Sequence, residues 1–124
     1  MNLSSARVFV KDLSAAHSFY AQALGLPLRA GGPEAGFCVY AAGNCQLVVE
    51  SVASDAPVED QALVGRFTGL SFTVQDIDAQ HRSLAGKGVI FTGLPERQAW
   101  GGTLATLLDP AGNGLQLVQH PSAA

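Results

Sequence analysis

An internal repeat constrains the fold of this chain more than any other feature of its sequence. Residues 7–17 (RVFVKDLSAAH) align with residues 71–81 (SFTVQDIDAQH), 64 positions later. Five positions recur as the same or a similar residue: Val10, Asp12, Leu13, Ala15 and His17 match Val74, Asp76, Ile77, Ala79 and His81. The spacing between the two copies is about half of the 124-residue chain, which predicts two similar supersecondary units.

Each copy reads as a strand, a helix and three further strands. Strands are expected over 4–10, 27–31, 36–42 and 45–52, and again over 68–74, 89–93, 102–109 and 114–119. Helices are expected over 14–24 and 78–87, with Ser14 and Asp78 as N-caps. Gly-Asn pairs at 43–44 and 112–113 suit tight hairpins between the last strands. The fold class is therefore predicted as α+β, with two βαβββ repeats.

The domain prediction is a single domain over 1–124. It consists of repeat 1 (4–52), a more polar linker (53–66) and repeat 2 (67–120). Hydrophobic residues make up 48% of the chain and charged residues 14%, which excludes a disordered protein. The formal net charge of −3, without a basic stripe, gives no indication of nucleic-acid binding.

No apolar stretch is long enough to span a bilayer, and the N-terminal residues do not resemble a signal peptide. A cytoplasmic protein without membrane or nucleic-acid partners is therefore expected. Cys38 and Cys45 flank a probable turn, across which they could face each other, and are expected to be reduced, partly buried thiols.

The order and spacing of several short motifs resemble the vicinal oxygen chelate superfamily, which includes glyoxalase I, extradiol dioxygenases and bleomycin-resistance proteins. The motifs are residues 10–13 (VKDL), 19–20 (FY), 24–26 (LGL), 100–102 (WGG) and 109–113 (DPAGN). This resemblance implies a partly open mixed β-barrel or cleft with the helices outside. It also implies a homodimer in which two chains complete two clefts.

Enzymes of this superfamily hold one divalent metal on four strand positions. The resemblance carries those positions to Ser5, Val48, Gly69 and Gln116. Valine and glycine have no donor atom, and hydroxyl and amide oxygens are poor ligands for first-row metals. The sequence therefore predicts no metal, no cofactor and no catalytic residue. His17 and His81 are expected on the outer surfaces of helices, and His120 in an exposed tail.

The ligand-binding residues are instead predicted from strand alternation and from the resemblance. Arg7 and Phe9 share one strand face, and Glu50 and Gln116 are expected to face the same cleft. Arg7 either binds a carboxylate or phosphate of the ligand, or it pairs with Glu50 or lies at the solvated mouth of the cleft. Trp100 either stacks on a planar ligand or caps the barrel, because its spacing to the Asp-Pro turn is one residue longer than in the family pattern.

The leading hypothesis is a protein that binds a small molecule without a metal ion and is not an enzyme. The bound molecule is an antibiotic, which the protein sequesters, or a metabolite. The alternative is a metal-dependent glyoxalase-like lyase, isomerase or dioxygenase that uses non-standard ligands such as Glu50 and Gln116. A third hypothesis is an accessory module that binds another protein. The sequence alone does not choose between pairing of the two halves within one chain and exchange between chains.

Overall fold

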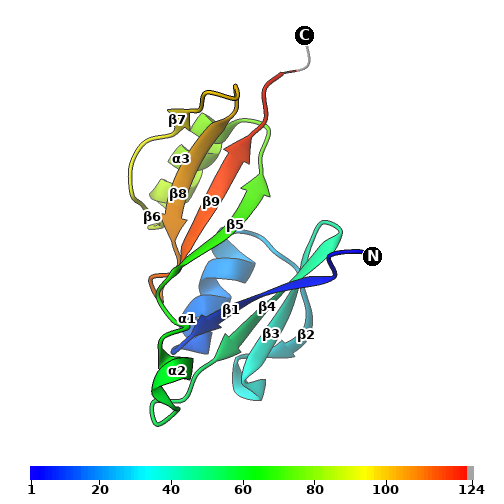
Figure 1. The fold of residues 1–124 in the computed structure, drawn as a ribbon, viewed down its shortest axis with the longest axis vertical. Coiled ribbons are helices and arrows are strands. Elements are labelled where there is room, and N and C mark those ends of the chain that lie inside the picture. Colours follow the sequence, from blue (N-terminus) through cyan, green and yellow to red (C-terminus); the bar gives the residue numbers. More distant parts are fainter. Residues whose placement is uncertain (123–124) are drawn as a thin grey trace. The chain divides into compact units, whose positions relative to one another are not determined.

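The computed structural model describes residues 1–122 and has an α+β fold with two β-sheets, neither of which closes into a barrel (Figure 1). The predicted fold class is confirmed. The chain divides into two compact units, one of residues 1–66 with Pro110–Asn113 and one of the remaining residues from Phe67 onward. No helix among the described residues is long and apolar enough to cross a membrane. The assignment of residues 1–124 to one domain stays a prediction.

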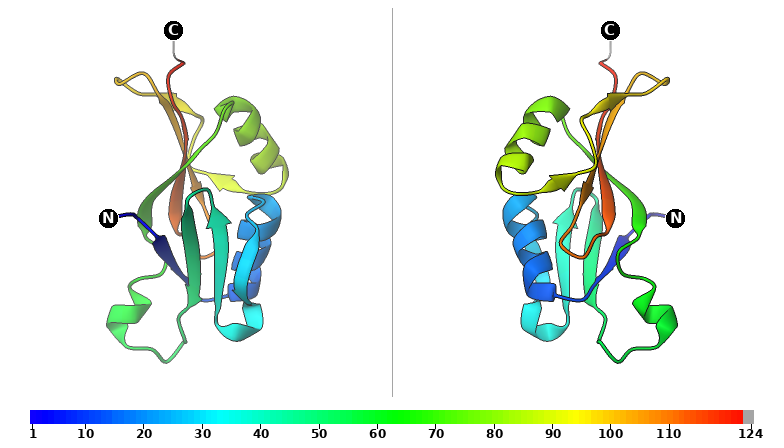
Figure 2. Two further views of the ribbon diagram at one scale, coloured as in Figure 1. Left: turned by 90° about the vertical axis from the view of Figure 1, so that its right-hand side faces the viewer. Right: turned by 90° about the vertical axis from the view of Figure 1, so that its left-hand side faces the viewer.

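The first unit is a four-stranded sheet with the strand order β1-β4-β3-β2, in which β1 runs parallel to β4. One face of this sheet is covered by a helical segment in which α1 continues into the π-helical η1 (Figure 2). The bounds are β1 Ser5–Val10, α1 Leu13–His17, η1 Ser18–Ala23, β2 Leu28–Gly32, η2 Pro33–Ala35, β3 Phe37–Ala42, β4 Cys45–Ser51 and α2 Val58–Gln61.

Side-chain alternation explains which face of the first sheet is buried. Val8 and Val10 of β1 are almost inaccessible, whereas Arg7 is exposed and Phe9, between the two valines, is half-buried. Tyr20 of η1 and Tyr40 of β3 are fully buried on the covered side, with ring centroids 5.9 Å apart. Each such side chain stabilises the fold by roughly 1.5–3 kcal/mol through burial of apolar surface. The opposite face is left open for other contacts.

The second unit repeats this plan around the strand order β5-β9-β8-β6, with β7 paired to β8. Ile77 and Leu84 of α3 are buried, as are Leu107, Leu115 and Leu117 of the sheet. Exposed and half-buried residues alternate along β5, so its outer face carries Gly69, Ser71 and Thr73. The bounds are β5 Phe67–Thr73, α3 Ile77–Gly86, β6 Ile90–Phe91, β7 Glu96–Arg97, β8 Thr103–Leu108 and β9 Gly114–Gln119.

The predicted helix N-caps, Ser14 and Asp78, are wrong by two residues. Asp12 and Asp76 are the caps, and their Oδ1 atoms accept hydrogen bonds from the amides of Ala15 (3.0 Å) and Ala79 (3.1 Å). The helices therefore begin at Leu13 and Ile77, which bury their side chains in the first turn. The recurring aspartate of the repeat thus has a capping role in both copies.

The cysteines and the repeated histidines have defined surroundings. Cys38 and Cys45 are free thiols, but Cys38 lies opposite Val49 and Cys45 opposite Ala42, so they do not face each other.

His17 and His81 lie on helices, as expected, yet both have partners. The rings of His81 and Phe91 are tilted at 39° with their centroids 4.1 Å apart, and His17 is half-buried beside Tyr40.

The contact between His17 and Tyr40 joins α1 to the sheet. The Nδ1 atom of His17 lies 2.7 Å from the Tyr40 hydroxyl. Burial, together with the neighbouring Cys38 thiol, raises the pKa of Tyr40 above its ordinary value, so the hydroxyl stays protonated and can donate to Nδ1. The histidine is therefore a structural partner of Tyr40 rather than a free surface group.

Tyr40→Phe is expected to lower the free energy of unfolding by about 1–2 kcal/mol, because it leaves Nδ1 of His17 without its donor while keeping the ring. Urea denaturation of both proteins at pH 7.5 measures the difference. His17→Gln is the companion variant. A Tyr40→Phe protein as stable as the parent would contradict the structural role assigned to this hydrogen bond.

Candidate functional site

The open face of the first sheet contains a hollow of about 400 Å³, here called the first-sheet hollow. Two β1 side chains, Arg7 and Phe9, form one side of it, and Glu50 of β4 lies next to them. The segment that follows β4 and contains α2 forms the other side. The full lining is Arg7, Phe9, Glu50, Ser51, Val52, Ala53, Ala56, Asp60 and Leu63.

Arg7 and Glu50 form an ion pair at this hollow, which answers one of the alternatives left by the sequence. Nε and Nη2 of Arg7 lie 2.9 and 2.6 Å from the same carboxylate oxygen, Oε1 of Glu50. The guanidinium carbon also lies 5.4 Å from the centroid of the Phe9 ring. Nη1 of Arg7 and Oε2 of Glu50 form no hydrogen bond with the described residues, so the pair offers a ligand both a donor and an acceptor.

The Arg7–Glu50 pair is expected to add little to stability. The Arg7 side chain is 57% exposed and that of Glu50 is 29% exposed, so water screens the attraction. A double-mutant cycle with Arg7→Gln and Glu50→Gln should give a coupling energy below about 1 kcal/mol in urea denaturation. A coupling several times larger would show that the pair is structural rather than available to a ligand.

The second sheet has its own hollow, of about 250 Å³, here called the second-sheet hollow. Gln116 of β9 lines it, and its Nε2 atom lies 3.3 Å from the hydroxyl oxygen of Thr106 on the paired strand β8. Gln116 is thus a half-buried amide on the floor of a polar hollow. The other lining residues are Thr92, Gly93, Leu94, Glu96, Gln98, Leu104, Ala105 and Thr106.

Trp100 lies outside both hollows, on the turn before β8. Its side chain is 53% exposed, and its ring lies 6.0 Å from that of His120. The indole covers Gly102 so closely that a Cβ atom added there would overlap the ring. The glycine is therefore required by the position of the tryptophan.

The structure thus brings three of the predicted ligand-binding residues into one hollow of the first unit. Arg7, Phe9 and Glu50 share the first-sheet hollow, whereas Gln116 lines the second-sheet hollow. Asp60 and Leu63 also line the first-sheet hollow, although the sequence assigns them only to a linker. The one sequence signal for them is Pro57, which precedes the short helix α2 at a position typical of helix starts.

The four positions that the superfamily uses for metal ligands do not fit a divalent metal in this chain. Val48 and Gly69 have no donor atom, Ser5 is exposed, and the Gln116 amide contacts Thr106. Gly69 also has φ +75° at a register shift of β5, a conformation that disfavours any side chain. Among residues 1–122, no group of three or more His, Cys, Asp or Glu side chains is arranged to hold a metal ion.

Comparison with known proteins gives consistent matches over almost the whole chain. The family model described as "Glyoxalase/Bleomycin resistance protein/Dioxygenase superfamily" matches residues 2–117. The uncharacterized protein YraH of Bacillus subtilis (strain 168) is 27% identical over 124 residues, covering 94% of this chain and 97% of YraH.

Two solved structures have both a similar fold and comparable identity. A member of the same superfamily from Sphaerobacter thermophilus DSM 20745 is 28% identical, with a TM-score of 0.79 over 97% of this chain and 98% of that one. TnmS3, an antibiotic binding protein from Streptomyces sp. CB03234, is 28% identical, with a TM-score of 0.76 over 98% and 97% of the two chains. With the repeated βαβββ units and the matched family model, these results show that the chain belongs to the glyoxalase/bleomycin resistance protein/dioxygenase superfamily, the vicinal oxygen chelate superfamily.

Proposed function

We propose that this protein binds a small organic molecule without the help of a metal ion, as bleomycin-resistance-like members of the superfamily do. The observation that carries the proposal is the residue set at the four metal positions, which offers no carboxylate, imidazole or thiolate donor. The same open sheet faces carry hydrogen-bonding groups, namely the Arg7–Glu50 pair and Gln116. A ligand is then held and oriented rather than activated.

The composition of the first-sheet hollow supports this role. Its volume of about 400 Å³ lies within the usual range for small-molecule sites. Phe9, Val52 and Leu63 supply apolar surface, and Arg7, Glu50 and Asp60 supply directional polar contacts. The similarity to TnmS3, an antibiotic binding protein, favours a sequestered antibiotic or metabolite as the ligand.

A homodimer is part of the proposal. The resemblance implies that two chains complete two clefts, and several large apolar side chains are available for such an association. Phe67, Ile90 and Leu94 are 61%, 65% and 77% exposed. Exposed apolar surface of this kind is a feature of association sites. Light scattering of the protein as it elutes from a size-exclusion column should give the mass of two chains. A monomer at micromolar concentration would contradict the proposed homodimer. A cytoplasmic location stays a prediction.

A thermal-shift screen of metabolites and antibiotics tests the proposed function. A ligand at 100 times its dissociation constant should stabilise the folded protein by about 2.7 kcal/mol. Each compound is tested in chelator and in divalent metal salts. Saturable stabilisation without turnover supports the proposal, whereas metal-dependent conversion of a compound would instead support a lyase, isomerase or dioxygenase.

A further inference from the structure

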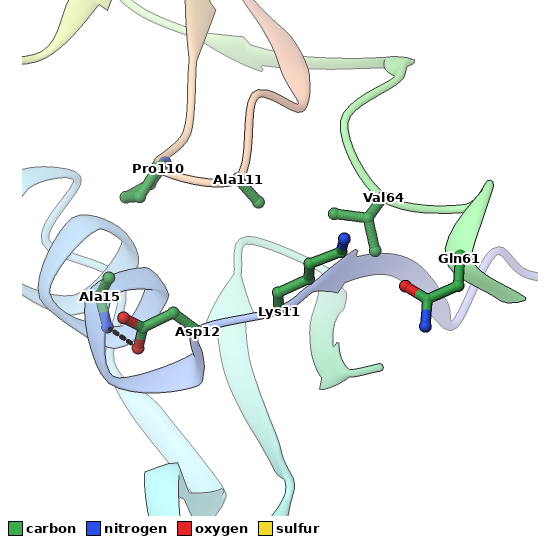
Figure 3. A pocket seen from close by; sticks show the side chains of 7 residues that line it. All are labelled: Lys11, Asp12, Ala15, Gln61, Val64, Pro110 and Ala111. Carbon is green, nitrogen blue, oxygen red and sulfur yellow. Dashed lines mark hydrogen bonds between the residues drawn. The ribbon is translucent and has the colours of Figure 1, made fainter. Parts of the chain in front are cut away.

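We propose that the first unit has a second small-molecule site, beside Lys11, for a zwitterion that carries a carboxylate, an amine and an apolar body. The site is a hollow of about 430 Å³, here called the Lys11 hollow (Figure 3). This volume suits a small ligand. Its lining comes from the connection between β1 and α1, from α1, from the end of α2 and the segment after it, and from the turn at 110–113: Lys11, Asp12, Ala15, Gln61, Val64, Pro110 and Ala111. It shares no lining residue with either sheet-face hollow.

One wall of the Lys11 hollow is fixed by the side chain of Gln61. Its Nε2 atom donates to the carbonyl oxygens of Ala53 (2.8 Å) and Ser54 (3.0 Å). The amide nitrogen is thereby held in the loop after β4, and Figure 3 shows the amide oxygen on the side nearer Lys11. This oxygen has no hydrogen bond with the described residues and can accept one from a ligand.

The opposite wall is the turn that carries Pro110 and Ala111, and it too is anchored. Asn113 of this turn is fully buried and accepts a hydrogen bond from the amide of Gly65 (2.8 Å). It also donates to the carbonyl oxygen of Phe9 (2.9 Å), and Val64 forms a parallel bridge with Phe9. The apolar surfaces of Val64 and Ala111 are therefore held in place before any ligand arrives.

The charged groups of the hollow determine the ligand class. The Lys11 ammonium forms no ion pair with the described residues, so it can receive a carboxylate. Asp12 uses Oδ1 to cap α1, and its side chain points away from Lys11, toward Ala15 (Figure 3). The Gln61 oxygen, on the side nearer Lys11, is the group that can receive an ammonium group. A cation and a nearby hydrogen-bond acceptor beside an apolar wall complement a zwitterion better than a simple anion or a simple cation.

The Lys11 hollow is next to the first-sheet hollow, because residues 60–64, at the end of α2 and just after it, contribute to both linings. Asp60 and Leu63 line the first-sheet hollow, whereas Gln61 and Val64 line the Lys11 hollow. A test must therefore separate the two sites. Lys11 and Arg7 are a suitable pair for this purpose, because each is the one cation in the lining of its own hollow.

The test is a titration of the ¹⁵N-labelled full chain, followed by two-dimensional NMR, with three probes of one carbon skeleton. L-leucine carries both charged groups, 4-methylpentanoate lacks the amine and 3-methylbutylamine lacks the carboxylate. We expect saturable shifts of the Ala15, Gln61 and Ala111 amides with leucine, and binding about tenfold weaker or less for either of the other two.

Variants locate the binding. Lys11→Gln should weaken the binding of leucine by about tenfold or more, whereas Lys11→Arg should keep much of the affinity of the parent protein. Arg7→Gln, in the first-sheet hollow, should leave leucine binding unchanged. Lys11 is exposed, so these variants should fold normally. No saturable shift with leucine, equal binding of all three probes, or a loss on Arg7→Gln but not on Lys11→Gln would overturn the proposal. None of these outcomes bears on the proposed function, which concerns the sheet faces.

Discussion

Asn113→Ala is expected to destabilise the protein more than any other single substitution considered for this chain, by about 3 kcal/mol or more. The Asn113 side chain is fully buried and joins three backbone groups. Its Oδ1 atom lies 2.8 and 3.3 Å from the amides of Gly65 and Arg66, and its Nδ2 atom donates to the carbonyl of Phe9 at 2.9 Å. Alanine would leave these groups without a partner and would also open a cavity.

Urea denaturation followed by circular dichroism measures the loss, with Asn44→Ala as a matched control. Asn44 follows the corresponding glycine of the first repeat but is exposed, so its substitution should cost well under 1 kcal/mol. Asn113→Asp should be intermediate or worse, because a carboxylate can accept from the two amides but cannot donate to Phe9. Equal, small losses for Asn113→Ala and Asn44→Ala would show that these hydrogen bonds contribute little.

Ala56→Trp is expected to abolish ligand binding in the first-sheet hollow. Ala56 is half-buried and lines the hollow together with Arg7, Phe9 and Leu63. An indole at this position would occupy much of the space of about 400 Å³ without removing any polar group. The stabilisation of about 2.7 kcal/mol expected from a ligand at 100 times its dissociation constant should fall to almost nothing.

The matched control is Ala62→Trp, at an exposed position of the same segment that lines neither this hollow nor the Lys11 hollow. It adds the same side chain and should leave ligand stabilisation unchanged. Both proteins should unfold near the parent temperature in the absence of ligand. Full stabilisation of Ala56→Trp by a screen hit would place the ligand elsewhere in the chain.

The arrangement of strands was predictable because local signals agree with the global fold. Alternating apolar residues and Gly-Asn turns identify the long strands in both repeats, and the structure has them within one or two residues of the expected bounds. The short elements α2 and β7 were not predicted, since segments of only four and two residues carry no usable periodicity. The helix starts were placed one residue late and the N-caps two residues late, because Ser14 and Asp78 also carry side-chain oxygens that can cap a helix.

The candidate site was predictable only in part. Strand alternation places Arg7, Phe9 and Glu50 on one face, and these three side chains do line one hollow. Asp60 and Leu63 could not be placed, since the course of a linker depends on tertiary contacts rather than on local pattern. Likewise, no pattern in the sequence indicates that the Trp100 ring covers Gly102, or that Gln116 lines a hollow to which Trp100 does not contribute.

Gly69 illustrates how backbone geometry strengthens an argument first made from residue types. The sequence shows only that this metal-ligand position lacks a donor. The structure adds a reason for the glycine, since φ of +75° at the register shift between β5 and β9 suits glycine far better than a ligating side chain. A metal-binding side chain at position 69 would require a different strand conformation.

The metal dependence of ligand binding tests the central claim most directly. The protein is purified without chelators, its metal content is measured by elemental analysis, and the thermal shift of a screen hit is compared in EDTA and in nickel, zinc, manganese or iron salts. We predict substoichiometric metal and the same ligand-induced shift in every condition. Stoichiometric metal, together with a ligand shift that disappears in EDTA and in Glu50→Ala, would contradict metal-independent binding.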